Sequence, residues 1–231
     1  MGQGARDGKG SGWMQRLEGP RFGPKAGGTA RQLVVLLHGV GADGADLIAL
    51  APEWAEVLPE AAFIAPDAPF PCDMAPFGRQ WFSLADRDPE RLAEAVRGVA
   101  PTLEAFLQAE LDRLGLPPAA LALMGFSQGA MTALFAGLRG SVPPAAILAY
   151  SGALLAPQTL AAELRARPPV LLVHGEADEL VPVRASRLAE AALREAGVPV
   201  EALFLPGLGH GIDATGIAAG TALLRRAFGA E

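Results

Sequence analysis

Three residues of the sequence, Ser127, Asp178 and His210, are of the types that together carry out nucleophilic acyl transfer. Ser127 is the centre of Gly125-Phe126-Ser127-Gln128-Gly129, a G-x-S-x-G pentapeptide. A serine hydroxyl becomes a good nucleophile when an imidazole takes its proton and a carboxylate orients that imidazole. The order Ser, acid, His along the chain is one of the known orders for this chemistry. The sequence therefore predicts a reaction through an acyl-enzyme intermediate.

The pentapeptide lies between a predicted strand and a predicted helix, where a sharp turn could hold a nucleophile. The apolar run Leu121–Gly125 is typical of a buried strand, and a helix is expected to begin near Gln128. Strand and helix pass close together at such a turn, which favours small residues such as Gly125 and Gly129 beside the serine. The free N–H groups and the dipole of the helix would face the negative charge that develops on a substrate oxygen. A chance glycine-rich turn is the alternative, and the two flanking elements count against it.

His210 is the predicted base among the three histidines of the chain. It lies between glycines on a loop beyond the last predicted strand, and it alone has an acid between itself and Ser127 on a loop after a strand. His38 precedes the serine, and His174 ends the predicted strand Val170–Val173. Both of these are expected to be hydrogen-bonded structural residues.

Asp178 is the predicted acid, because it lies on a loop at the carboxyl end of a strand, from which a carboxylate can orient an imidazole. Glu176 and Glu179 are alternatives on the same loop. Asp213, beside His210, is a further alternative.

An anionic tetrahedral intermediate also needs hydrogen-bond donors, the second of which usually comes from the turn after an earlier strand. The segment Leu37-His38-Gly39-Val40-Gly41 is such a turn, and its glycines let the backbone approach a substrate. The N–H groups of Val40 and Gln128 are therefore the predicted oxyanion hole. The alternative is a turn that only changes the direction of the chain.

The elements that must position these residues follow an alternating pattern, typical of βαβ units around a mostly parallel sheet with helices on both faces. The apolar runs are nearly continuous, as expected for strands covered on both sides. The predicted strands are Gln32–Leu37, Ala61–Ala65, Leu121–Gly125, Ala146–Tyr150, Val170–Val173 and Val200–Leu205. The predicted helices include Pro89–Leu114, with Asp88 as N-cap and a kink or break near Pro101, then Val183–Ala196 and Thr215–Phe228.

The chain of 231 residues has the length of one α/β domain, which we place at residues 29–231 after a flexible head at residues 1–28. The head is rich in glycine and charge, and Trp13–Leu17 could form a short edge strand. Removal of the head should be tolerated. The segment Pro66–Arg87 has neither a helical nor a strand period, and loops of this length usually cover sites.

Composition excludes several classes of protein. The net charge of −6 and the absence of a Lys/Arg block argue against a nucleic-acid partner. The single cysteine, Cys72, cannot form an intramolecular disulfide, so the fold does not require an oxidising compartment. We find neither a signal peptide nor a membrane span, and we expect a cytoplasmic location. The oligomeric state stays open, a homodimer included.

The chain resembles the carboxylesterase and lysophospholipase family that includes the acyl-protein thioesterases. The resemblance runs from about residue 32 to about residue 213. The matching pieces are Leu36-Leu37-His38-Gly39-Val40-Gly41 with Asp46, Pro66-Asp67-Ala68-Pro69, Gly78-Arg79-Gln80-Trp81-Phe82, Gly125-Phe126-Ser127-Gln128-Gly129-Ala130, His174-Gly175 with Asp178 and Val181-Pro182, and Gly209-His210. Glu176 stands where many members carry Asp.

This resemblance implies an α/β-hydrolase fold with little or no cap domain, which hydrolyses esters or thioesters without a metal or a cofactor. It also implies oxyanion donors at Val40 and Gln128, and an acyl-binding wall from the loop Phe77–Phe82. The predicted substrate-binding residues are Phe77, Arg79, Trp81 and Phe82. Alternatively, Trp81 and Phe82 simply pack the loop onto the core.

The predicted function is hydrolysis of carboxylic esters, or thioesters, of short to medium acyl chains, with a small-molecule or lipid ester as substrate. A lysophospholipase or acyl-protein thioesterase on the same site is one alternative, and a perhydrolase or lactone hydrolase is another. A non-catalytic binding protein on a hydrolase scaffold is an alternative of a different class. The presence of all three triad residues counts against that last alternative.

Overall fold

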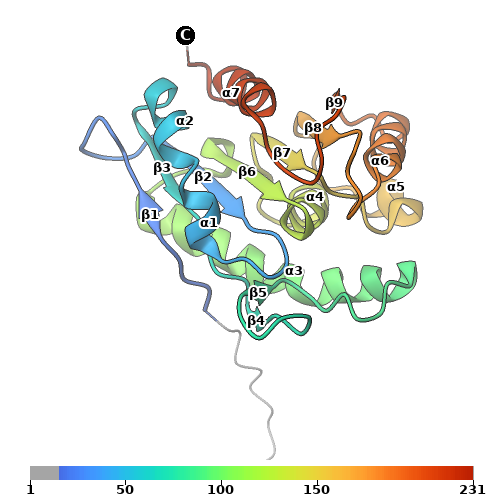
Figure 1. Ribbon diagram of the computed structural model, residues 1–231. Coiled ribbons are helices and arrows are strands. Elements are labelled where there is room, and N and C mark those ends of the chain that lie inside the picture. Colours follow the sequence, from blue (N-terminus) through green and yellow to red (C-terminus); the bar gives the residue numbers. More distant parts are fainter. Residues whose placement is uncertain (1–15, 231) are drawn as a thin grey trace, which may run out of the picture.

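The computed structural model describes residues 16–230, which form a seven-stranded sheet flanked by helices (Figure 1). The strand order is β1-β3-β2-β6-β7-β8-β9, and all neighbours are parallel except β1, which pairs antiparallel with β3. The strands are β1 (Arg21–Phe22), β2 (Gln32–Leu37), β3 (Ala61–Ile64), β6 (Leu121–Phe126), β7 (Ala146–Tyr150), β8 (Val170–Gly175) and β9 (Val200–Leu205).

The six strands predicted from the sequence are confirmed, with ends that differ by at most two residues. Every residue of β7 and β8 is buried, as expected for strands covered on both faces. Strand β9 differs from the prediction, because none of its residues is buried. It pairs only with β8 and forms the edge of the sheet, so solvent reaches it despite its apolar sequence.

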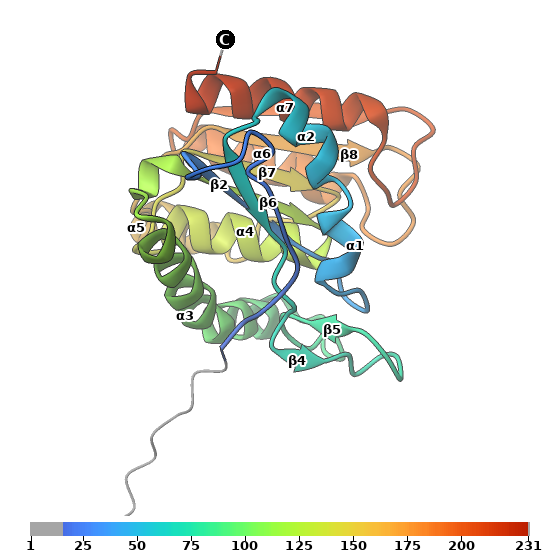
Figure 2. The same ribbon diagram turned by 90° about the vertical axis from the view of Figure 1, so that its left-hand side faces the viewer.

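Helices cover both faces of the sheet (Figures 1 and 2). One face packs Trp54, Tyr150 and Leu224 into one core cluster, and the other packs Leu103 and Leu134 into a second. The first face carries α1 (Gly44–Ile48), α2 (Ala51–Val57) and α7 (Ala214–Phe228), and the second carries α3 (Pro89–Leu114), α4 (Gln128–Arg139), α5 (Leu160–Glu163) and α6 (Arg184–Glu195). Helices α1 and α2 were not predicted.

Helix α3 runs as one helix through Pro101, so the break that the sequence allowed as an alternative to a kink does not occur. Its ends are as predicted, with the Asp88 side chain accepting from the first-turn amides and Gly115 closing the helix in the left-handed conformation. Buried residues lie on both sides of the proline, among them Val96 and Leu103. Burial of apolar residues on both sides stabilises the continuous helix although the proline removes one hydrogen bond.

The described part of the head, residues 16–28, is built into the domain. Leu17 is 5% exposed and belongs to the core, and the Asp67 amide donates to the Glu18 carbonyl at 2.8 Å. The edge strand is β1, not Trp13–Leu17: residues 13–15 lie outside the described residues, and Arg16 and Leu17 have no strand structure. The short pairing of β1 with β3 covers what would otherwise be an open edge.

The segment Pro66–Arg87 contains a small hairpin, β4 (Phe70–Pro71) and β5 (Arg79–Gln80), which the sequence did not predict. Two backbone hydrogen bonds of 2.8 Å fasten it to the turn after β2: Gly41 donates to the Arg79 carbonyl, and the Arg79 amide donates to the Ala42 carbonyl. The hairpin therefore lies over the carboxyl end of the sheet.

Candidate active site

Ser127 occupies a strained turn between β6 and α4. Its φ of 54° and ψ of −117° lie in a region that side chains rarely adopt. A Cβ on Gly125 would lie 2.3 Å from the Gly129 carbonyl oxygen, and one on Gly129 would lie 1.9 Å from the Leu37 carbonyl oxygen. Glycine is therefore required at both positions, because strand and helix touch through their backbones. The turn lifts the Ser127 hydroxyl to the edge of the sheet.

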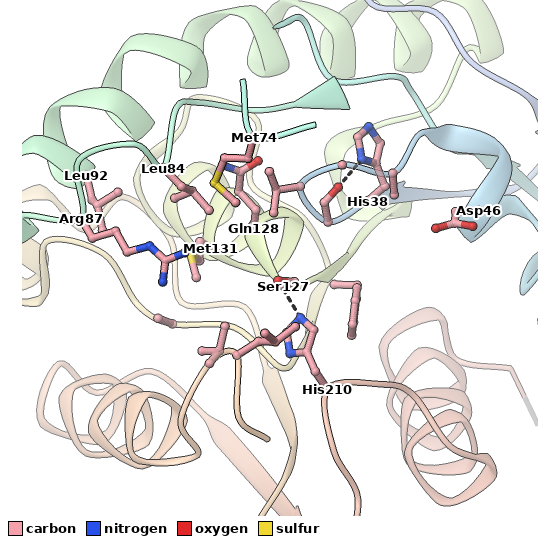
Figure 3. A pocket seen from close by; sticks show the side chains of 18 of the residues that line it. His38, Asp46, Met74, Leu84, Arg87, Leu92, Ser127, Gln128, Met131 and His210 are labelled. Carbon is pink, nitrogen blue, oxygen red and sulfur yellow. Dashed lines mark hydrogen bonds between the residues drawn. The ribbon is translucent and has the colours of Figure 1, made fainter. Parts of the chain in front are cut away.

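The structure brings the three predicted triad residues together. His210 Nε2 lies 3.0 Å from Ser127 Oγ (Figure 3). His210 Nδ1 lies 2.6 Å from Asp178 Oδ2. The Phe126 ring lies against the His210 ring, with 4.8 Å between the centroids. The imidazole is thus held between a carboxylate and a hydroxyl, the geometry in which it can take the hydroxyl proton.

The Asp178 carboxylate is buried and saturated with donors. Its Oδ1 accepts from the amides of Leu180 and Val181, both at 2.9 Å, and its side chain has no exposed surface. Burial by itself raises the pKa of Asp178, but the hydrogen bonds from His210 and from the two amides outweigh burial and leave the pKa below its ordinary value. The carboxylate is therefore ionised at neutral pH.

The alternative acids have other partners. Glu176 forms an ion pair with Arg187, with 2.6 Å between Oε1 and Nη2. Asp213 caps α7 by accepting from the Gly216 amide at 2.8 Å. Glu179 is exposed at the rim of the cavity. Asp178 is the carboxylate that contacts His210.

His38 is buried in the turn after β2 and fixes that turn, in line with its predicted structural role. Its Nδ1 lies 2.7 Å from the Gly39 carbonyl and its Nε2 accepts from the Ala68 amide at 2.9 Å. Burial lowers the pKa of His38, which favours the neutral ring with a proton on Nδ1. The indole N–H of Trp81 donates to the His38 carbonyl at 2.9 Å and ties the hairpin segment to the same turn.

Val40 and Gln128 line the cavity on either side of Ser127. Gln128 is the first residue of α4, and neither its amide nor that of Val40 has a hydrogen-bond partner within residues 16–230. The Gln128 side chain is fully buried, accepts from the Trp81 amide at 2.8 Å and donates to the Phe82 carbonyl at 2.6 Å. Two unpaired amides beside a nucleophile suit a developing oxyanion.

A cavity of about 770 Å³ opens over Ser127 (Figure 3). One end is polar, with the carboxylates of Asp43 and Asp46 near the turn after β2. Elsewhere the lining is mostly apolar, and Arg87 and Glu179 add charged side chains to it. The apolar wall consists of Met74, Leu84, Leu92, Met131, Ala153 and Leu155. A substrate with one apolar part and one polar part would fit this arrangement.

The four residues predicted to bind substrate do not line this cavity, as far as residues 16–230 describe it. Phe77 is 73% exposed, whereas Trp81 is fully buried and Phe82 is 3% exposed. Arg79 donates to the carbonyls of Ala68 and Pro69, both at 2.8 Å. Trp81 and Phe82 belong to the buried core cluster, the arrangement that the alternative interpretation describes. The apolar wall that replaces them has no motif of its own, although part of it comes from the loop 66–87 that the sequence expected to cover a site.

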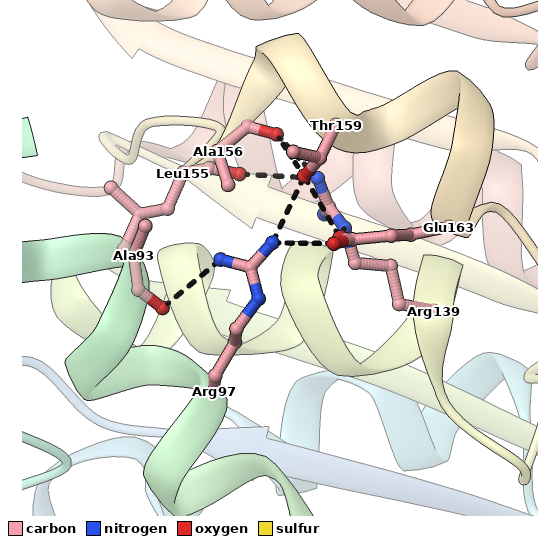
Figure 4. A network of polar contacts seen from close by, with 7 residues as sticks. All are labelled: Ala93, Arg97, Arg139, Leu155, Ala156, Thr159 and Glu163. Carbon is pink, nitrogen blue, oxygen red and sulfur yellow. Dashed lines mark hydrogen bonds and ion pairs between the residues drawn. The ribbon is translucent and has the colours of Figure 1, made fainter. Parts of the chain in front are cut away.

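A polar network supports the back of the apolar wall (Figure 4). Arg139, 8% exposed, donates to the carbonyls of Leu155 and Ala156 at 3.3 and 2.7 Å. Glu163 accepts from Arg139 at 2.9 Å and from Arg97 at 2.6 Å. Ala156 has a φ of 51°, so this loop needs outside support to hold its shape. The network thereby fixes the Leu155 side chain in the cavity wall.

Within residues 16–230, His, Cys, Asp and Glu do not gather in threes as a metal site would require. In the same range, every helix is too short or too polar to cross a bilayer.

Residues 25–225 match the family model described as Phospholipase/Carboxylesterase. Acyl-protein thioesterase 1 of Gibberella zeae is 35% identical over 109 residues, which cover 45% of this chain and 46% of that protein. This chain thus matches less than half the length of that fungal relative. Esterase YpfH of Escherichia coli K12 is 28% identical over 185 residues, which cover 80% of this chain and 78% of that protein.

Solved structures agree in fold. The crystal structure of esterase PE8 has a TM-score of 0.86 and 43% identity over 91% of this chain and 99% of that chain. Acyl-protein thioesterase 2 of Zea mays has a TM-score of 0.68 and 26% identity over 90% of this chain and 98% of that chain. The chain therefore belongs to the phospholipase/carboxylesterase family of α/β-hydrolases.

Proposed function

We propose that the protein is a serine carboxylesterase that hydrolyses esters of short to medium acyl chains, with Ser127, His210 and Asp178 as its catalytic triad. The observation that carries the proposal is the chain of contacts from Asp178 through His210 to Ser127 at 2.6 and 3.0 Å, on the floor of a cavity. A non-catalytic scaffold would have no need to keep a strained serine in line with an imidazole.

In the proposed mechanism His210 Nε2 takes the Ser127 proton while Oγ bonds to the acyl carbonyl carbon. The amides of Val40 and Gln128 donate to the resulting oxyanion. His210 then gives its proton to the leaving alcohol, the ester C–O bond breaks, and an acyl-enzyme remains. Water attacks this ester with His210 as base, and the acid and free Ser127 are released.

The apolar wall supports an acyl group as the part of the substrate bound beyond Ser127. Met131 on α4 and Leu155 after β7 face this space, and Met74 and Leu84 come from the segment that covers it. The leaving group would then lie toward His38 and Asp46 at the polar end. A mostly apolar lining with a few polar groups is typical of pockets that bind small ligands.

A thioesterase acting on acylated thiols is the second candidate, favoured by the fungal relatives named acyl-protein thioesterase. The same triad would serve, because only the leaving atom changes from oxygen to sulfur. Oxygen esters and thioesters of one acyl chain, compared at equal concentration, distinguish the two: a higher kcat/KM for the thioester would favour the second candidate.

The test of the proposal is hydrolysis of p-nitrophenyl esters from acetate to palmitate by the wild type and by Ser127→Ala. We expect turnover by the wild type that falls to background in the variant, with an optimum at a chain shorter than palmitate. A phosphonate probe should label the wild type and not the variant. Equal rates in both proteins, or labelling of both, would mean that Ser127 is not the nucleophile.

A further inference from the structure

A second imidazole contacts the carboxylate of the triad. His174, at the end of β8, is 1% exposed, and its Nε2 lies 3.1 Å from Asp178 Oδ2 and 2.7 Å from the Val181 carbonyl oxygen. Its Nδ1 lies 2.6 Å from Ser186 Oγ on α6. The proposed mechanism uses only His210, so this ring is a buried imidazole without an assigned role.

The contacts determine where the ring carries a proton. A carbonyl oxygen and an ionised carboxylate can only accept, so His174 Nε2 must be a donor to either of them. Ser186 Oγ lies 2.6 Å from Nδ1 and 3.2 Å from the Gly152 carbonyl, and its single proton serves one of these two. Whichever it serves, Nε2–H is present.

Asp178 is therefore surrounded by N–H groups, although the His174 Nε2–H hydrogen-bonds to the Val181 carbonyl and only approaches Asp178 Oδ2. Oδ1 accepts two amides, and Oδ2 accepts from His210 Nδ1 at 2.6 Å and faces His174 Nε2 at 3.1 Å. The amides alone leave the carboxylate free to tilt about the bond to its Cβ. On the Oδ2 side, beside the His210 contact, the His174 N–H lies 3.1 Å away on a ring held by Val181 and Ser186, and its positive end can limit that tilt.

We propose that His174 is a positioning residue, whose Nε2–H holds Asp178 Oδ2 in line with His210. The inference rests on the proposed function, since it concerns how the triad is held. The competing role is purely structural: the ring would link the loop after β8 to α6 through Val181 and Ser186. Loss of a structural link lowers stability, whereas loss of a positioning contact lowers kcat at unchanged KM.

Two substitutions separate these roles. His174→Gln keeps an N–H donor at similar reach, and His174→Met keeps the bulk without a donor. We expect kcat of the Met variant, per active site titrated with a phosphonate, to fall about 10- to 100-fold, the range known for outer partners of metal-bound histidines. KM should not change, and the Gln variant should recover most of the loss. Ser186→Ala is the matched control, because it removes the Nδ1 partner and leaves Nε2–H; its kcat should stay close to wild type.

Equal kcat for the Met variant and the wild type, with a lower Tm, would overturn the inference, as would equal losses in the Gln and Met variants. Nitrogen-15 NMR of histidine-labelled wild type provides a test that needs no variant: a proton on Nδ1 alone of His174 would also overturn it. The proposed function fails separately, by inactivity of the wild type in the same assay.

Discussion

Asp178 and Glu163 are two carboxylates with several donors each, and the difference between their donors separates the proposed catalytic site from a structural network. Asp178 faces two imidazoles and two amides, whereas Glu163 accepts from two guanidinium groups and from the Thr159 hydroxyl. In both cases burial raises the pKa and the hydrogen bonds outweigh it, so that each pKa lies below its ordinary value. The two networks are thus alike in charge.

They differ in what their partners can release. A guanidinium keeps its proton at any pH a protein meets, so the network of Arg97, Arg139 and Glu163 can only hold its neighbours in place. An imidazole binds and releases a proton near neutral pH, so a carboxylate beside it can stabilise a charge that comes and goes. The comparison indicates that contact with an imidazole, rather than with a guanidinium, distinguishes Asp178 of the proposed catalytic site from Glu163.

The largest expected effect is that of Asp178→Asn, which should lower kcat about 10⁴-fold, because the amide favours the wrong His210 tautomer. The fold should persist, since the side chain keeps its shape. Steady-state kinetics on p-nitrophenyl butyrate checks this, with Glu163→Gln as the matched control. A comparable loss of kcat in the control would erase the distinction between the two networks.

Arg139→Met should act on stability. The substitution leaves Glu163 with Arg97 alone and leaves two loop carbonyls without their donor, so the free energy of unfolding should fall by about 1 to 3 kcal/mol, the cost of unpaired acceptors. Urea denaturation at neutral pH measures it. The kcat for acetate esters should change little, because acetate does not reach Leu155. A stable but inactive variant would contradict this assignment.

Ala153→Phe should narrow the cavity at its apolar wall and shift the preferred ester to one with a shorter acyl chain. Each methylene that no longer fits costs about 1 to 3 kcal/mol of discrimination, so the octanoate-to-acetate ratio of kcat/KM should fall at least tenfold. Phe77→Ala is the matched control: Phe77 is 73% exposed and outside the cavity, so its profile should match the wild type. A shifted profile for Phe77→Ala would restore the original sequence prediction.

The smallest expected effect is a pH dependence of stability. Because the pKa of Glu163 is lower in the folded protein than in the unfolded chain, its stabilisation is complete above the unfolded pKa and disappears as pH falls through the folded pKa. The difference in unfolding free energy between wild type and Glu163→Gln should therefore be constant at neutral pH and shrink below about pH 4.5. Urea titrations at several pH values measure this difference. A difference in unfolding free energy that grows as the pH falls would contradict a lowered pKa of Glu163 in the folded protein.

The sequence predicted the residues that form the Ser127–His210–Asp178 contacts better than those that surround them. Ser127 and His210 could be found because the chemistry demands particular residue types in a fixed order, on loops after strands. The apolar wall could not be found, because residues such as Met131 and Leu155 come from separate segments and are ordinary core residues in type. Trp81 shows the reverse case. Its residue type suggested a binding role, whereas in the structure its side chain is buried and its N–H donates to the His38 carbonyl.

The fold shows the same division. Long apolar runs predicted β2, β7 and β9 to the residue. Burial between helices dictates the composition of β2 and β7, whereas β9 is apolar although it lies at the edge of the sheet. The short helices α1 and α2 were missed, because five and seven residues hold too few turns for a period to appear.

The position of Gln128 has a consequence for reading mutant libraries. Its amide belongs to the backbone and survives every replacement except proline, while its side chain joins the Trp81 amide to the Phe82 carbonyl. Activities measured for side-chain replacements at this position would therefore reflect how well the segment 66–87 is anchored. They would not measure the contribution of the Gln128 amide to binding the proposed oxyanion. Backbone chemistry, such as an ester in place of the amide bond, is needed to weigh that donor by itself.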